Sequence, residues 1–350
     1  MRLNTISLAA GVLLIMLAPA TTFARHPATF TNRISTIAFG SCSQQWGPQA
    51  YWKRIQSLQP DLWIWMGDNV YNDTTDMQKM VRKYSSMYTN PAYQAFRESV
   101  DIIGTWDDHD FGENNGGNWY PMRAASQAAL LDFLDDPTDS ARRDQNGVYT
   151  AYDFGPAGAQ IRVILLDTRY HAERPGPQSD LLGEAQWTFL ERSLTGCDAE
   201  FVILGSSIQV IPLDHRFEKW GNWPESRARL LKLIRESGVK GLILISGDRH
   251  IHELSLYDPA GGPYPLLELT SSGLTHAWTK FPGEKNRFRL GDVHVDNGFG
   301  VIELDWNADL PTVSLQIRDM QGAVRHRLDL PLSALSSTRE GPDPKPVTSD

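Results

Sequence analysis

Short apolar runs alternate with segments of helical spacing through the middle of the chain. The apolar runs predict strands at residues 34–39, 62–66, 101–105, 161–166, 201–204 and 242–245. Helices are predicted between them, at residues 49–58, 77–88, 122–134, 183–194 and 225–236. This alternation is typical of a layered α/β fold.

The pattern changes after residue 250, where predicted strands follow one another with only turns between them. These strands lie at residues 252–257, 266–270, 300–305, 312–318 and 324–330. We interpret them as a second, antiparallel sheet packed on the first. One domain, residues 30–335, holds all of these elements. Residues 336–350 are rich in Ser, Pro and charge, which predicts a disordered tail.

The N-terminus has the features of a signal peptide. Arg2 precedes an apolar run over residues 6–17, and small residues then lead to Ala24. The run is shorter than the ~20 residues that a membrane span needs. We therefore expect residues 1–24 to be cleaved, and the mature protein to be periplasmic or secreted, without a stable membrane span.

The formal net charge of −9 restricts the classes of partner. There is no basic field to neutralise a nucleic-acid backbone, so nucleic-acid binding is not expected. A phosphate-ester substrate remains compatible with this charge, because bound metal cations would reverse its local sign. No sequence feature predicts a protein partner.

Polar clusters follow each of the predicted strands of the first half. They read GSCS (40–43), GDNVY (67–71), WDDHDFG (106–112), DTR (167–169), GSSIQ (205–209) and GDRHIHE (247–253). Ligands of open α/β sheets bind at the carboxyl ends of the strands. We therefore expect these clusters to converge on one crevice.

The clusters contain the residue types of a metal-dependent hydrolase. The neighbouring carboxylates Asp107, Asp108 and Asp110 would repel one another unless a cation lay between them. His250 and His252 are two residues apart, so on a regular strand they would share one face beside Asp248. No G-x-S-x-G elbow is present, which disfavours a serine hydrolase.

The two cysteines, Cys42 and Cys197, allow two interpretations. In an oxidising compartment they would form a disulfide. Cys42, however, follows the first predicted strand and lies among the other candidate ligands, and thiolates bind transition metals. We favour a free Cys42 that faces a metal.

The order of these motifs resembles that of the alkaline phosphatase D family, the PhoD-like branch of the metallophosphatase superfamily. The motifs that carry the resemblance are GSCS, GDNVY, WDDHD, LDTR, LGEAQWTFLERSL and GDRHIHE. The resemblance extends over residues 34–257. It implies a four-layer α/β/β/α sandwich, in which helices flank two mixed β-sheets. It also implies a hydrolase of phosphoric ester bonds.

The resemblance assigns roles to residues of the matching motifs. Asp68 corresponds to the carboxylate that bridges two metals, and Asp108 and His109 to the catalytic pair, of which Asp108 is also a ligand. Asp248 and His250 correspond to paired ligands, and Cys42 to a cysteine that ligates iron. His252 is a further candidate ligand from its spacing. Family members with an iron–calcium centre also use a tyrosine, for which the candidates here are Tyr84 and Tyr88.

The expected cofactors are two or more divalent or trivalent metal ions. The resemblance suggests iron and calcium, and the ligand types also suit zinc or manganese. Arg169 is a candidate catalytic residue, and Asn69, Arg249 and His276 are candidate substrate-binding residues, since guanidinium groups bind phosphoryl oxygens well.

The predicted function is hydrolysis of phosphomonoesters or phosphodiesters by metal-activated hydroxide at a dinuclear centre. One alternative keeps the chemistry but takes phospholipid or teichoic-acid diesters as substrates. Another is a catalytically silent carbohydrate- or ligand-binding protein, for which Trp46, Trp119, Trp220 and Trp223 could stack on sugars.

Overall fold

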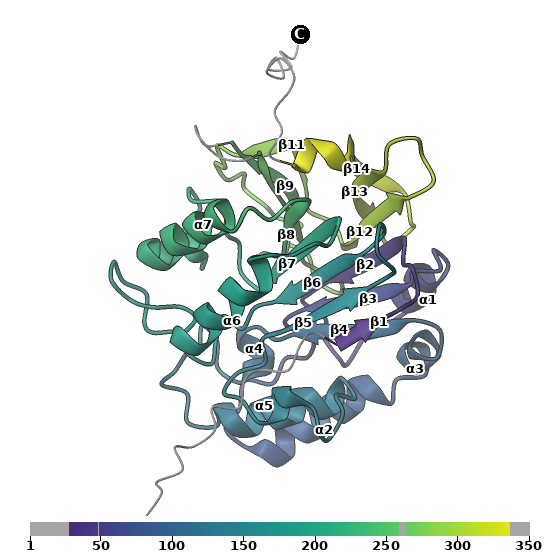
Figure 1. The fold of residues 1–350 in the computed structure, drawn as a ribbon. Helices are drawn as coiled ribbons and strands as arrows, with labels where there is room; N and C mark the ends of the chain where they lie inside the picture. The colour runs from purple at the N-terminus through teal and green to yellow at the C-terminus, as the bar shows by residue number, and fades with distance from the viewer. Residues whose placement is uncertain (1–27, 48, 259–263, 337–350) are drawn as a thin grey trace, which may run out of the picture.

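The computed structural model describes residues 28–47, 49–258 and 264–336, which form two facing β-sheets between layers of helices (Figure 1). The signal peptide predicted at residues 1–24 and all but the first residue of the predicted tail lie outside this range. Both stay predictions. Within the described residues, no helix is both long and apolar enough to cross a membrane.

The larger sheet has eight strands in the order β1-β5-β6-β7-β8-β10-β9-β11. The strands are β1 (Ala28–Phe30), β5 (Thr150–Phe154), β6 (Ile161–Leu165), β7 (Phe201–Ser206), β8 (Leu242–Ser246), β9 (His252–Tyr257), β10 (Leu266–Ser271) and β11 (Arg289–His294). The central strands β6, β7 and β8 are parallel, whereas β9 runs antiparallel to β10.

The smaller sheet has six strands in the order β14-β13-β12-β2-β3-β4. They are β2 (Thr36–Gly40), β3 (Leu62–Met66), β4 (Asp101–Thr105), β12 (Gly298–Asp305), β13 (Thr312–Asp319) and β14 (Val324–Pro331). β2, β3 and β4 are parallel, and β12 joins them antiparallel to β2. Each sheet is therefore mixed.

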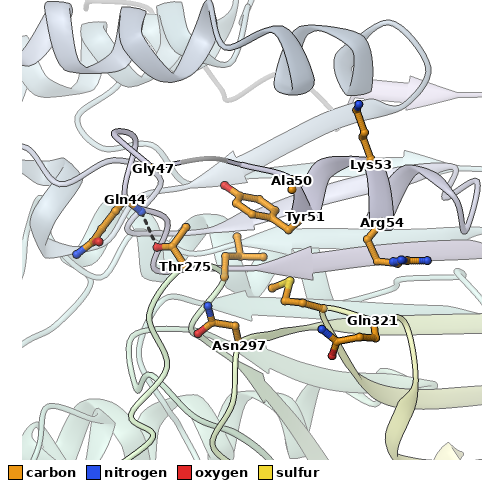
Figure 2. A pocket seen from close by; sticks show the side chains of 11 residues that line it. Gln44, Gly47, Ala50, Tyr51, Lys53, Arg54, Thr275, Asn297 and Gln321 are labelled. Carbon is orange, nitrogen blue, oxygen red and sulfur yellow. Dashed lines mark hydrogen bonds between the residues drawn. The ribbon is translucent and has the colours of Figure 1, made fainter.

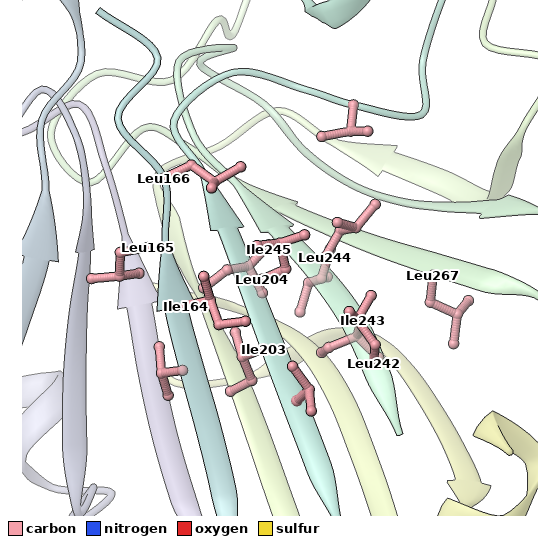
Figure 3. Packing of buried hydrophobic residues seen from close by; sticks show 14 of the residues in the cluster. Ile164, Leu165, Leu166, Ile203, Leu204, Leu242, Ile243, Leu244, Ile245 and Leu267 are labelled. Carbon is pink, nitrogen blue, oxygen red and sulfur yellow. The ribbon is translucent and has the colours of Figure 1, made fainter. Parts of the chain in front are cut away.

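Helices cover the outer faces of both sheets, which lie on opposite sides of the molecule in Figure 1. The smaller sheet packs against α1 (Tyr51–Gln56), α2 (Met77–Tyr88), α3 (Pro91–Arg97) and α5 (Arg123–Phe133), and the larger against α6 (Glu184–Leu194) and α7 (Pro224–Ser237). The strands β7 and β8 are buried along their whole length. Figure 3 shows their Leu and Ile side chains packed together, as expected of parallel strands covered on both faces.

The helix α2 illustrates how the local sequence sets an element. Asp76 caps its N-terminus, where the carboxylate accepts hydrogen bonds from the backbone N–H groups of Gln78 and Lys79. The buried residues Met80, Tyr84 and Met87 are spaced at three and four, which places them on the face that packs against the sheet.

The prediction that the strands after residue 250 form a second, antiparallel sheet of their own was wrong. The early strands β2, β3 and β4 share a sheet with the late strands β12, β13 and β14, joined where β2 pairs with β12. The strands β6, β7 and β8 share the other sheet with β9 and β10, joined where β8 pairs with β10. The periodicity of a strand reports its burial but not its neighbour, so the pattern alone did not reveal this exchange. The two mixed sheets implied by the family resemblance are confirmed.

The topology places the carboxyl ends of both sets of parallel strands together. The loops after β2, β3 and β4 meet the loops after β6, β7 and β8, and the short helix α4 (Asp108–Phe111) begins directly after β4. Most of the polar clusters predicted to converge are in these loops.

Candidate metal centre

Four candidate ligands have left-handed backbone conformations at the strand ends. The φ angles are 61° at Cys42 after β2, 51° at Asp68 after β3, and 64° and 54° at Asp248 and His250 after β8. A non-glycine residue in this region costs on the order of 1–3 kcal/mol, and such strain concentrates at functional sites. The fold therefore holds these residues in turns that their intrinsic preferences do not favour.

The side chains form three overlapping groups whose potential ligand atoms lie within 4.8 Å of one another. These groups are Cys42, Asp68 and His250; Asp68, Asp108 and His109; and Asp107, Asp108 and Asp248. Asp68 is common to the first two groups, and Asp108 to the last two. This overlap is the arrangement that two neighbouring cations sharing a carboxylate would need.

Burial makes the negative charge of this cluster unfavourable. The pKa of Asp68 is raised well above its usual value by burial and by the neighbouring Cys42 and Asp108. The pKa of Asp248 is raised to about 7 by burial, with Asp107 and Asp108 contributing. Cations would remove this cost, so the electrostatics fit a metal centre.

The thiol of Cys42 is buried and is not part of a disulfide. Its Sγ lies 3.3 Å from Asp68 Oδ2 and 3.0 Å from Ser272 Oγ. Cys197 lies before the amino end of β7, whereas Cys42 follows the carboxyl end of β2. Burial raises the pKa of Cys42 to about 12, so only a bound cation would hold it as a thiolate at neutral pH.

His109 is oriented by a carboxylate that the sequence analysis missed. Its Nδ1 lies 2.8 Å from both oxygens of Asp73. Burial lowers the pKa of His109, but the hydrogen bond to Asp73 and the charges of Asp68 and Asp108 prevail and raise it to about 10. His109 is therefore a cationic proton donor when no metal neutralises these carboxylates.

Asp108 and Asp110 have different roles although they are two residues apart. Asp108 accepts hydrogen bonds from the backbone N–H groups of His109 (2.9 Å) and Asn115 (2.6 Å). Asp110 accepts hydrogen bonds from the backbone N–H groups of Asp107 and Asp68, at 2.6 and 3.2 Å. Asp110 thus ties the loop after β3 to the loop after β4 and is absent from the ligand groups.

Tyr71 is a further site residue that the sequence analysis did not select, although it ends the quoted GDNVY motif. Its hydroxyl lies 3.2 Å from Asp68 Oδ2. Of the tyrosines considered, Tyr84 instead donates to the backbone oxygen of Asp110, and Tyr88 to Asp135. A position three residues after the central carboxylate was the available signal.

The structure places Arg169 in a buried ion-pair network. Its Nε and Nη2 lie 2.7 and 2.5 Å from Asp107 Oδ1, and Nη2 also lies 2.5 Å from Glu218 Oε2. Ser207 Oγ donates to the same Asp107 oxygen at 2.6 Å. These ion pairs give Arg169 a positioning role, in which it fixes Asp107, and its catalytic role stays a prediction.

Replacing Arg169 by Met should destabilise the protein by about 3–5 kcal/mol, because Asp107 and Glu218 would lose their buried counterion. Urea unfolding of the metal-free protein measures this change. The control is Arg229→Met, which breaks the exposed ion pair with Glu184 and should cost less than about 1 kcal/mol. Similar losses in the two variants would contradict the assigned role.

His252 is the predicted ligand that the structure does not bring to the centre. It is fully buried on β9, and its Nδ1 pairs with Ser271 Oγ at 3.0 Å. His250 precedes the strand in a left-handed turn, so the alternation of a regular strand does not apply between them. The expectation that both imidazoles share one face assumed a regular strand and does not apply here, and His252 as a ligand stays a prediction.

The three candidate substrate-binding residues surround the centre in different states. The guanidinium of Arg249 pairs with Glu284 through Nη2 at 2.5 Å, while its buried Nε has no hydrogen-bond partner among the described residues. The ring centroids of His276 and His250 lie 4.5 Å apart. Burial is the main cause that lowers the pKa of His276 to about 4, and the neighbouring His250 and His109 contribute. Asn69 donates to Thr105 O, while its Oδ1 is buried without a hydrogen-bond partner among the described residues.

Two facing mixed sheets define a metallophosphatase-like fold, with carboxylate, imidazole and thiol groups at the strand ends as candidate metal ligands. The PhoD-like phosphatase family model matches residues 37–288. The chain therefore belongs to the PhoD-like phosphatase family, which confirms the resemblance found in its motifs.

Individual relatives agree with this assignment. The chain is 23% identical to alkaline phosphatase D of Bacillus subtilis (strain 168) over 271 residues, which cover 61% of this chain and 46% of that protein. The match thus spans about half of the relative's length. The structure of PhoD has a TM-score of 0.68 at 17% identity, covering 87% of this chain and 70% of the other. A dimetal phosphatase from Danio rerio has a TM-score of 0.56 at 13% identity, covering 86% and 100%.

Proposed function

We propose that the protein hydrolyses phosphate esters at a dinuclear metal centre. The observation that carries this proposal is the chain of overlapping ligand groups, in which Asp68 and Asp108 link a sulfur- and nitrogen-containing set to an all-carboxylate set. Buried oxygens without hydrogen-bond partners, Asn69 Oδ1 and Asp107 Oδ2, support the presence of cations.

The first and the last of the three overlapping ligand groups suit different metals. Cys42, His250 and Tyr71 offer sulfur, imidazole and phenol groups near Asp68, a combination that favours a transition metal such as iron. Asp107, Asp108 and Asp248 offer only oxygen, which favours a hard cation such as calcium, magnesium or manganese. Zinc would also suit the first set.

Bound cations would lower the pKa of a coordinated water and neutralise negative charge on the phosphoryl group. The residues of the chain would hold and orient the substrate around them. Asp73 fixes the ring of His109 through Nδ1, which leaves Nε2 to donate a proton to the leaving alcohol oxygen. Asp108 is held in place by two backbone N–H groups.

Metal removal tests the function. We expect purified protein to hydrolyse p-nitrophenyl phosphate, to lose this activity after exhaustive chelation, and to regain it on addition of iron with calcium. Metal content is measured on the same samples. Full activity in samples shown to contain no metal would contradict the proposal.

The role of Cys42 gives a spectroscopic prediction. A thiolate bound to iron(III) produces a visible charge-transfer band, so the iron-loaded protein should be coloured. Cys42→Ser should bleach the band, whereas Cys197→Ser should leave colour and activity near normal, since Cys197 lies outside the centre. A colourless, active protein with a free Cys42 would mean that the metals are bound through oxygen and nitrogen alone.

The structure gives little support to a silent sugar-binding protein. Trp220 and Trp223 are buried, and their indole N–H groups donate to Ser206 and to the backbone of Glu173. Arg174 lies 4.3 Å above the ring of Trp119. Among the four loop tryptophans only Trp46, at 64%, is largely exposed, so these four do not form a stacking platform. Phospholipid or teichoic-acid diesters remain candidate substrates.

A further inference from the structure

A cleft of about 760 Å³ lies between α1 and the turn that joins β13 to β14. Figure 2 shows Gln44 and Thr275 at one end of this cleft and Lys53 and Arg54, from one turn of α1, at the other. The proposed function does not use any of these four residues. The cleft therefore needs its own explanation.

The end of the cleft at Thr275 adjoins residues next to the metal centre. Thr275 Oγ1 lies 2.8 Å from Nδ1 of His276 and 3.2 Å from the backbone oxygen of Cys42. The backbone N–H of Gln44 donates to the same hydroxyl at 2.8 Å. A substrate whose phosphoryl group lies at the centre would thus have the cleft next to it.

The other end of the cleft carries uncompensated positive charge. Lys53 and Arg54 are both exposed, and neither has an ion-pair partner within the described part of the chain. A Cβ atom at Gly322 would lie 3.2 Å from Arg54 Cδ, so the glycine in the β13–β14 turn leaves room for the arginine stem. Two adjacent unpaired cations are notable in a chain with a net charge of −9.

The middle of the cleft combines amide groups with an apolar floor. The Asn297 side chain accepts the backbone N–H of Ala277 through Oδ1 at 2.8 Å, which leaves its NH₂ group to donate to a ligand. Gln321 adds a second side-chain amide, while Leu274 and Met320 supply apolar surface. This mixture suits a hydroxylated carbon chain.

We propose that the cleft binds the alcohol portion of the substrate, and that Lys53 and Arg54 bind a second phosphoryl group on it. The substrate class is then a phosphate ester whose leaving group carries another phosphate, either a terminal monoester or an internal diester. This inference rests on the proposed function, because it places the scissile phosphate at the metal centre.

Binding of non-hydrolysable ligands tests the cleft without requiring turnover. Isothermal titration of the metal-loaded protein compares methylphosphonate with alkane bisphosphonates of increasing chain length. We expect at least one bisphosphonate to bind about tenfold more tightly than methylphosphonate, equal to about 1.4 kcal/mol. Lys53→Glu combined with Arg54→Glu should abolish this gain and leave methylphosphonate affinity and p-nitrophenyl phosphate turnover unchanged.

The matched control is Lys232→Glu combined with Arg235→Glu on α7, which lies across the molecule from α1 (Figure 1). This variant should keep the gain. Equal affinity of the wild type for methylphosphonate and every bisphosphonate, or a gain that survives reversal of Lys53 and Arg54, would overturn the inference. A gain in a protein that hydrolyses no ester would instead overturn the proposed function and leave the cleft assignment standing.

Kinetics with two further substrates distinguish the source of the second phosphate. Fructose 1,6-bisphosphate carries a terminal monoester, and a synthetic glycerol phosphate dimer carries an internal diester. The substrate whose KM rises when the charges of Lys53 and Arg54 are reversed identifies the natural class of substrate. Because both cations are exposed, added salt should weaken the effect.

Discussion

Asp68→Asn removes measurable phosphatase activity and lowers the metal content of the purified protein. Asp68 is buried, belongs to two of the three ligand groups, and lies 3.3 Å from Cys42 Sγ and 3.2 Å from the Tyr71 hydroxyl. An amide keeps the shape of this side chain but removes the charge that binds the cations. Activity on p-nitrophenyl phosphate and elemental analysis of the same preparation measure both effects.

His109→Ala is the matched comparison for this prediction. It should reduce turnover by about 10²–10⁴-fold, the usual contribution of a general acid, while metal content stays near that of the wild type. A full complement of metal in Asp68→Asn would contradict the dinuclear assignment. Equal loss of metal and turnover in His109→Ala would make His109 a ligand.

Asp248→Asn should stabilise the metal-free protein and abolish stabilisation by metal. Burial raises the pKa of Asp248 to about 7, above its usual value, so its contribution to stability is full at low pH and is lost as the pH rises through about 7. At about pH 8 the asparagine removes this cost, and we expect a gain of about 1–3 kcal/mol. The gain should shrink towards about pH 5, where the carboxyl is protonated in the folded protein.

Thermal unfolding at both pH values, with and without metal, tests this reversal. The wild type should be the less stable protein without metal at the higher pH and the more stable protein with metal. Asp108→Asn is a useful contrast, because charges and backbone N–H groups outweigh burial and lower the pKa of Asp108. That substitution should not stabilise the metal-free protein. A less stable metal-free Asp248→Asn at the higher pH would contradict the electrostatic interpretation.

Elements with strong local signals could be predicted from the sequence. The strands β3 and β4 and the helix α2 span the predicted residues, because their apolar positions are continuous or helically spaced. The strand β11 was missed because it is partly exposed and polar. The short helix α3 was missed although Asn90 caps it and Pro91 begins it.

The site could be predicted in composition but not in all of its contacts. The clusters after β2, β3 and β4 meet because these parallel strands end at the same edge of one sheet, and the cluster after β8 of the facing sheet joins them. The pairing of Arg169 with Asp107 and Glu218 joins loops that follow strands of different sheets, and no local pattern reports such a contact. The spacing of Tyr71 from Asp68 was available in the sequence, but the left-handed turn at Asp68 that accompanies their contact was not.

The pairing of β12 with β2 has a consequence for the order of folding. Phe39 of β2 pairs with Gly300 of β12, so one side of β2 stays an open edge until nearly the whole domain has been synthesised. Cys42 directly follows this edge, and its partner Ser272 is 230 residues further along the chain. Closing contacts between such distant segments is slow. The candidate ligands on the early strands therefore reach their final positions only after the late strands have paired. Metal binding accordingly belongs to the last stages of folding.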